Sequence, residues 1–141
     1  MRALTRLALA GAILLLLRIG ASAETPVERG KYLVTTIGGC GNCHTPRDTA
    51  GKPIAGRELA GGFEFDDPGV GHIVGTNITP DPETGIGNWT EAQIVTALRD
   101  GKRPDGSIIG PPMPTPSYRQ LSDQDAAAVA AYLKRDRKSV V

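Results

Sequence analysis

Two thiols and an imidazole lie within five consecutive residues, Cys40-Gly41-Asn42-Cys43-His44. Two cysteines separated by two residues, with a histidine directly after the second, form the attachment pattern of a c-type haem. The spacing lets both cysteine sulfurs form thioethers to one porphyrin while the imidazole binds its iron. We therefore predict one haem c, attached through Cys40 and Cys43 and ligated by His44.

The same residues permit three other interpretations. A structural zinc site needs about four nitrogen or sulfur ligands, and the sequence offers only Cys40, Cys43, His44 and His72. A thioredoxin-like dithiol should begin a helix after a strand in a βαβ unit, whereas the residues before Cys40 lack the pattern of a buried strand. A structural disulfide is the third alternative. Haem attachment is the interpretation that we favour.

The second axial ligand of the iron determines whether a haem protein carries electrons or acts on a small ligand. Apart from Met1 and His44, the only methionine and the only histidine are Met113 and His72. Met113 lies in Gly110-Pro111-Pro112-Met113-Pro114, where the prolines restrict the backbone and disfavour helix. Thioether ligation suits an electron carrier because it raises the reduction potential. We favour Met113, and His72 is the alternative.

The N-terminus has the features of a secretory signal. Arg2 and Arg6 precede an uncharged run over residues 7–17, and Ala21-Ser22-Ala23 is a small-residue cleavage motif. We expect residues 1–23 to be removed after Ala23, and the chain to be exported to the periplasm of a Gram-negative bacterium. An uncleaved membrane anchor is the alternative, although the run is shorter than the roughly 20 residues of a spanning helix.

Residues 24–141 are predicted to form a single domain. The signal removes three of the 16 basic residues and no acid, so 13 basic residues face 15 acidic ones and the net charge is −2. This mild acidity argues against a nucleic-acid partner, which requires a basic patch. The sequence has few aromatic residues but 18 glycines and 11 prolines, so a haem is needed to complete a thin side-chain core.

Three capping patterns predict three helices. The first begins at Thr25-Pro26-Val27-Glu28 and runs to Gly38-Gly39. The second begins with the capping box Thr90-Glu91-Ala92-Gln93 and ends at Gly101. The third begins at Ser122-Asp123-Gln124-Asp125, with an acidic first turn and basic residues near its other end.

The connection between His44 and Trp89 exceeds forty residues and is rich in glycine and proline. A loop of this length is uncommon unless it is functional, and a haem would give it something to enclose. Phe63 and Phe65 alternate with a polar residue, and His72-Ile73-Val74 is a second short apolar run. Together they are compatible with a small β-ribbon.

The sequence resembles the single-haem class I c-type cytochromes, in particular the cytochrome domains and subunits of periplasmic bacterial alcohol, aldehyde and related dehydrogenases. The resemblance extends from about Arg29 to Lys134. It rests on the following segments: Arg29-Gly30-Lys31-Tyr32-Leu33, Cys40 to Arg47, Thr76-Asn77-Ile78-Thr79-Pro80-Asp81, Thr84-Gly85-Ile86-Gly87-Asn88-Trp89-Thr90, Met113-Pro114, and Tyr118 through Ser122-Asp123.

The resemblance implies an all-α class I cytochrome c fold, with about three to five short helices around one covalently bound haem. It implies His44 and Met113 as the axial ligands, and it places Asn77, Ile78 and Trp89 against the haem or near its propionates. For Trp89, ordinary packing of an aromatic ring is an equally good interpretation.

The function that we expect is electron transfer without a substrate of its own. A periplasmic dehydrogenase would donate electrons, and another cytochrome or a terminal oxidase would accept them. The alternative is a haem enzyme or gas sensor with an open or displaceable sixth site, in which His72 would act as a distal acid or base. Similar proteins often carry three haems and a C-terminal anchor, whereas this sequence ends at Lys138-Ser139-Val140-Val141. We therefore expect membrane contact only through an uncleaved signal or a partner.

Overall fold

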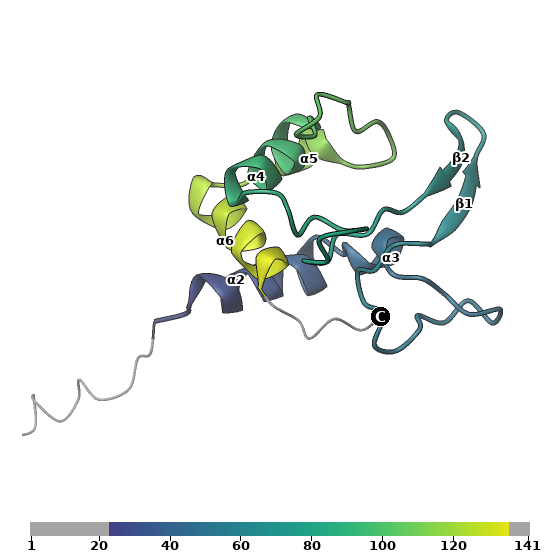
Figure 1. Ribbon diagram of the computed structural model, residues 1–141, viewed down its shortest axis with the longest axis horizontal. Coiled ribbons are helices and arrows are strands. Elements are labelled where there is room, and N and C mark those ends of the chain that lie inside the picture. Colours follow the sequence, from purple (N-terminus) through teal and green to yellow (C-terminus); the bar gives the residue numbers. More distant parts are fainter. Residues whose placement is uncertain (1–22, 136–141) are drawn as a thin grey trace, which may run out of the picture.

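The computed structural model describes residues 23–135. Within these residues there are five α-helices, one π-helical turn and one two-stranded sheet, which confirms the predicted helical architecture with a small β-ribbon. The elements in chain order are α2 (Pro26–Tyr32), η1 (Leu33–Ile37), α3 (Gly41–His44), β1 (Glu64–Asp67), β2 (Gly71–Val74), α4 (Glu91–Asp100), α5 (Thr115–Tyr118) and α6 (Asp123–Lys134). Helices α2, α4, α5 and α6 gather on one side, while α3 lies beside the long irregular connection (Figure 1).

The three predicted helix starts are confirmed by their caps. The hydroxyl of Thr25 accepts a hydrogen bond from the amide of Glu28 at 3.2 Å, and the Glu28 carboxylate accepts one from the amide of Thr25 at 2.8 Å. Thr90 and Gln93 form the same reciprocal pair at the start of α4. Ser122 caps α6 through the amide of Asp125. These local bonds satisfy amides that have no partner within the helix.

The first helix differs from the expected continuous α-helix. Its second half is the π-helical turn η1, in which the amide of Gly38 donates to the carbonyl of Leu33 at 2.7 Å. The amide of Cys40 then donates to the carbonyl of Val34 at 3.1 Å. A π-turn accommodates one more residue than an α-turn, so the chain bends back and brings Cys40 close to the helix that precedes it.

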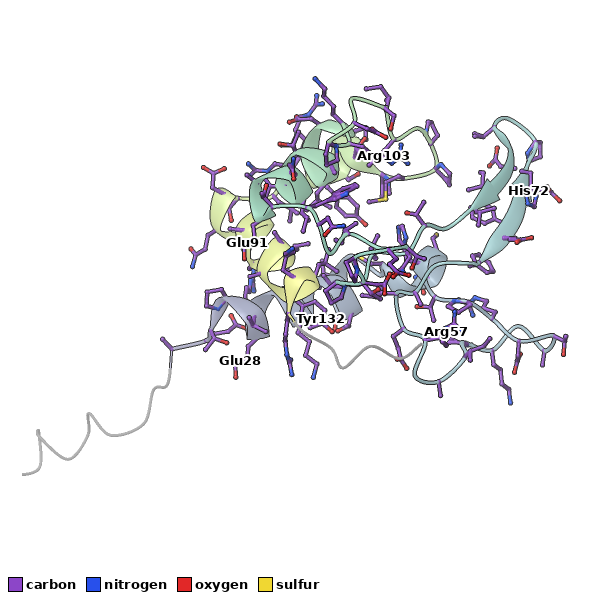
Figure 2. The ribbon with its side chains drawn as sticks, viewed as in Figure 1. Glu28, Arg57, His72, Glu91, Arg103 and Tyr132 are labelled. Carbon is purple, nitrogen blue, oxygen red and sulfur yellow. The ribbon has the colours of Figure 1, made fainter. Side chains whose placement is uncertain are left out.

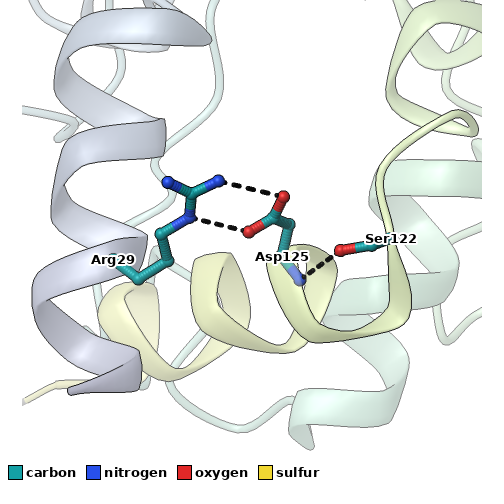
Figure 3. A network of polar contacts seen from close by, with 3 residues as sticks. All are labelled: Arg29, Ser122 and Asp125. Atoms are coloured by element: carbon teal, nitrogen blue, oxygen red, sulfur yellow. Dashed lines mark hydrogen bonds and ion pairs between the residues drawn. The ribbon is translucent and has the colours of Figure 1, made fainter. Parts of the chain in front are cut away.

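Helices α2 and α6 lie in close backbone contact at Gly30. A Cβ atom built on Gly30 would lie 1.9 Å from the carbonyl oxygen of Ala128, so only glycine allows this contact. Beside it, Arg29 and Asp125 form a two-point ion pair, with Nε–Oδ1 at 2.8 Å and Nη2–Oδ2 at 3.2 Å (Figure 3). The ion pair and the close backbone contact fix how α6 crosses α2.

The buried core joins the helices to the long connection. Ile94 and Leu98 of α4 pack against Val129 and Leu133 of α6, while Leu59 and Ile86 contribute from the connection. Other members of this cluster are Leu33, Val34, Ala128, Ala130 and Tyr132. The connection is therefore anchored to the helical core at two points.

The two strands form an antiparallel hairpin that projects from the helical part of the molecule (Figure 1). Glu64 lies opposite Val74, and Asp67 lies opposite Gly71. None of the helices between residues 23 and 135 is long and apolar enough to span a bilayer. The predicted signal over residues 1–23 lies outside the described residues except for Ala23.

Replacing Gly30 with alanine tests the contact between α2 and α6. We expect Gly30→Ala to lower the free energy of unfolding by about 3 kcal/mol, because the new methyl group would overlap the Ala128 carbonyl. Thermal unfolding of the haem-loaded protein measures this loss. The control is Gly69→Ala, whose Cβ would meet only the movable side chain of Asp67 at 3.3 Å. Equal melting temperatures for the two variants would contradict the proposed close contact.

The Arg29–Asp125 pair predicts a pH-dependent contribution to stability. Hydrogen bonds from the Arg29 guanidinium hold the pKa of the Asp125 carboxyl below its ordinary value of 3.8. A lowered pKa in the folded state adds stability above the unfolded pKa, and this stability is lost as the pH falls through the folded value. Asp125→Asn should therefore melt below the wild type at pH 7, and the difference should shrink as the pH falls below 3.8. Arg29→Gln should show the same pH dependence. A difference in melting temperature from the wild type that persists in acid would refute the contribution of the Arg29–Asp125 pair.

Candidate haem-binding site

A largely apolar cavity of about 650 Å³ lies between the helices and the hairpin. Its wall includes four segments that are distant in the sequence, 38–44, 73–78, 84–89 and 109–114, together with side chains of α4 and α6. This volume lies within the range of small-molecule and cofactor sites. The cavity brings together residues that the sequence separates by more than sixty positions.

The short helix α3 directs the three residues of the motif to this cavity. Its turn is closed by the amide of His44, which donates to the carbonyl of Cys40 at 2.9 Å. Residues three and four positions apart lie on the same face of a helix, so Cys40, Cys43 and His44 all line the cavity. Both cysteines are free thiols, and burial raises the pKa of Cys40.

A backbone carbonyl determines which nitrogen of His44 can bind a metal. The Nδ1 atom lies 2.7 Å from the carbonyl oxygen of Thr76. Because a carbonyl can only accept, Nδ1 carries the proton and Nε2 keeps its lone pair. Burial lowers the pKa of His44, an effect that the Thr76 carbonyl partly opposes, and the neutral imidazole is the form that binds iron.

The Thr76 carbonyl is held there by the close approach of Gly75. A Cβ on Gly75 would lie 1.8 Å from the carbonyl oxygen of Cys43, so no larger residue fits between the two chain segments. This contact places the end of β2 directly behind the cysteine and histidine segment. The imidazole is thereby oriented by a partner that is itself fixed, as is usual for metal-binding histidines.

Of the two candidates for the second ligand, only Met113 lines the cavity. It precedes α5, and its carbonyl accepts a hydrogen bond from the amide of Thr115 at 2.9 Å. His72 instead lies on the exposed hairpin, where its Nδ1 is 3.0 Å from Asp66 and its side chain is 58% exposed (Figure 2). The structure therefore brings Met113 to the site and leaves His72 outside it.

Tyr118 ties the methionine loop to the cysteine segment. Its hydroxyl, at the end of α5, donates to the carbonyl of Gly38 at 3.0 Å. Burial raises the pKa of Tyr118 to about 12, with smaller contributions from Cys40 and Cys43. The tie spans eighty residues of sequence and connects the two sides of the cavity.

The three residues suggested by resemblance also line the cavity. The amide side chain of Asn77 is engaged within its loop, where its oxygen accepts from the amide and hydroxyl of Thr79 and its nitrogen donates to Thr84 at 2.8 Å. Ile78 and Trp89 are partly buried and pack against the core cluster. Asn77 thus shapes the loop, while Ile78 and Trp89 supply apolar wall.

The competing interpretations of the motif receive no support from the structure. Over residues 23–135, no three histidine, cysteine, aspartate or glutamate side chains meet in a group that could hold a metal ion. The strand that a thioredoxin-like motif requires before Cys40 is replaced by α2 and η1. An apolar cavity, two thiols on one face and a correctly oriented imidazole instead fit a covalently attached haem.

Sequence patterns did not indicate several residues of the wall. Phe65 and Ile73 of the hairpin, Thr76 behind His44, and Arg103 on the loop after α4 all line the cavity. The alternation of Phe63 and Phe65 indicated a strand but not what it covers. The positions of Thr76 and Arg103 depend on tertiary contacts, for which no local pattern exists.

A small all-α domain that presents a C-x-x-C-H segment to an apolar cavity defines the class of c-type haem proteins. The family model described as Cytochrome c matches residues 27–135. The chain belongs to the cytochrome c family, whose members carry covalently bound haem c.

Its relatives include cytochrome subunits of bacterial dehydrogenases. The chain is 42% identical over 117 residues to the cytochrome c subunit of a quinone alcohol dehydrogenase from Gluconobacter oxydans, covering 83% of this chain and 23% of the relative. It is 42% identical over 122 residues to the fructose dehydrogenase cytochrome subunit of Gluconobacter japonicus, covering 85% and 23%. A diheme cytochrome c-type protein from Cereibacter sphaeroides is 40% identical over 96 residues, covering 68% and 31%.

The chain spans between about a quarter and a third of the length of these three relatives. Homology to electron-carrying subunits implies a role in electron transfer. It is consistent with a carrier that does not itself catalyse a reaction.

Removing the Tyr118 hydroxyl tests whether this tie holds the methionine loop. We expect Tyr118→Phe to lower the free energy of unfolding of the haem-loaded protein by about 1 kcal/mol, the contribution of one hydrogen bond. The matched control is Tyr32→Phe, because Tyr32 is 46% exposed and contacts Arg29 only through its ring. Denaturant unfolding measures both. If the two variants lost equal stability, Tyr118 would not act as a tie.

Proposed function

We propose that this chain is a periplasmic electron carrier whose haem c is attached through Cys40 and Cys43, with His44 and Met113 as axial ligands. When bound, haem c supplies a one-electron couple between Fe(III) and Fe(II). The observation that carries the proposal is that Met113 lines the same cavity as an imidazole whose Nε2 is left free. Two protein ligands would saturate the iron and leave no coordination site for a substrate.

The surroundings of the cavity support electron transfer over catalysis. A haem enzyme needs an acid or base near its open coordination site. Of the two histidines in the sequence, His44 is the proposed iron ligand and His72 is exposed on β2. The largely apolar wall, which includes Ile78, Trp89 and residues of the helices, would limit the access of water to a bound haem. Such a wall would reduce the reorganisation of solvent that accompanies electron transfer. The polarity around the haem would influence its reduction potential.

The names of the relatives support a dehydrogenase as the electron donor. We propose another cytochrome or a terminal oxidase as the acceptor, with no nucleic-acid partner. We propose a periplasmic location on the strength of the signal predicted over residues 1–23, with cleavage expected after Ala23. In this location electrons from an exported dehydrogenase can enter the respiratory chain.

Replacing Met113 tests the ligand assignment and, with it, the closed coordination that an electron carrier requires. We expect Met113→Ala to give a high-spin haem that binds CO readily and has a much lower reduction potential, because the thioether stabilises the ferrous state. Absorption spectra and a redox titration of purified protein measure these changes.

The control for Met113→Ala is His72→Ala, which removes the other candidate ligand. Since His72 is exposed and pairs with Asp66 and Glu64, this variant should keep the spectrum and potential of the wild type. A wild-type spectrum and potential for Met113→Ala would refute the ligand assignment. Rapid stoichiometric CO binding by the unmodified ferrous protein at neutral pH would favour a haem enzyme or sensor instead.

A further inference from the structure

One permanent positive charge lies in the largely apolar wall of the cavity. Among the described residues that line it, Arg103 is the only one with an always-charged side chain. The residue is half-buried on the loop that follows α4 (Figure 2). A charge taken partly out of water is costly unless an opposite charge or hydrogen bonds compensate it.

The loop around Arg103 holds the side chain in place. Lys102 and Ile108 form an antiparallel bridge, and the amide of Arg103 donates to the carbonyl of Ser107 at 2.9 Å. The guanidinium returns to the same loop, where Nη1 donates to the Ile108 carbonyl at 3.1 Å and to the Ser107 hydroxyl at 3.3 Å. Both bonds use one nitrogen, so the loop positions the guanidinium from one end.

The N–H donors at the other end of the guanidinium are unused by the described residues. An arginine has five N–H donors, and between residues 23 and 135 neither Nε nor Nη2 of Arg103 has a hydrogen-bond acceptor. Likewise, no carboxylate of the described chain lies within ion-pairing distance of this guanidinium. Arg29 differs in this respect, because its Nε and Nη2 both donate hydrogen bonds to Asp125.

We propose that Arg103 binds a propionate carboxylate of the haem, an inference that rests on the proposed function. A planar guanidinium with Nε and Nη2 free matches a carboxylate through two parallel hydrogen bonds. The pair would neutralise both charges at the edge of the apolar cavity and would keep the propionate ionised. Because Arg103 and Met113 lie on the same connection between α4 and α5, the pair would also fasten the methionine loop to the cofactor.

Ionisation of the propionate should then control how the reduction potential depends on pH. Other titratable groups near Arg103 are Lys102 and Asp105 on its own loop, and Cys40, Cys43, His44 and Tyr118 across the cavity. Hydrogen bonds from Ser107, with a smaller effect of Arg103, hold the pKa of Asp105 below its ordinary value, while the pKa of Tyr118 is about 12. The cysteines and the histidine would be occupied by the haem, and the shifted pKa values of Asp105 and Tyr118 lie outside the range from pH 5 to 9.

The experiment measures the midpoint potential of the haem-loaded full chain from pH 5 to 9, together with the resonance Raman bending mode of the propionates. In Arg103→Gln we expect the acid dissociation constant of one propionate to fall by at least about tenfold. Since ferric iron favours the ionised propionate, the pH at which the potential begins to fall should rise by about one unit or more. Arg103→Lys keeps the charge but offers a single donor point, and should give a smaller rise and a shifted Raman mode.

The matched control is Arg57→Gln, which removes one charge from an exposed position on the long connection (Figure 2). This control should keep the pH dependence and the Raman mode of the wild type. Arg103 variants that behave like the control would overturn the inference while leaving the proposed function intact. If Arg103→Gln did not load haem, an unshifted Raman mode in Arg103→Lys would overturn it. Absence of covalent haem from the wild type would overturn the inference and the proposed function together.

Discussion

The contact between two backbone segments behind the imidazole is the constraint on which the site depends. Gly75 lies so close to Cys43 that a methyl group would not fit, and this closeness brings the Thr76 carbonyl to 2.7 Å from His44. The carbonyl of His44 is held in turn by the amide of Gly61 at 2.7 Å. The glycine-rich connection is therefore the part of the chain that orients the metal ligand, since bulkier residues would separate these segments.

The helices provide the support against which that contact is held. Ile94, Leu98, Val129 and Leu133 belong to the buried core and also line the cavity. A haem in the cavity would thus pack directly on the helical core and extend it, which accounts for a fold with few aromatic residues. Dispersion and apolar burial over a large flat ring would then compensate for the small side chains of α6.

Local patterns predicted the parts of the fold that are held by local interactions. Thr25, Thr90 and Ser122 bind amides three residues away, so their roles could be inferred from spacing alone. The π-turn at residues 33–37, the short helix α5 and the left-handed backbone of Leu59 (φ 66°) could not be inferred in this way. Each depends on contacts with distant segments, as do the placements of Thr76 and Arg103 in the site. Met113 could be proposed from the sequence because only it and His72 were candidates for the second iron ligand. No local pattern distinguishes Arg103 from the other arginines.

Because of the π-turn, the number of residues between Thr25 and Cys40 is also constrained by the structure. Successive residues of a helix are rotated by about 100° around its axis, and the turn over Leu33–Ile37 contains one residue more than an α-turn of the same height. Deleting one residue there would allow a regular α-helix but would rotate the following thiol away from the cavity. The number of residues in this segment is therefore more tightly constrained than the identity of an exposed side chain such as Ile37.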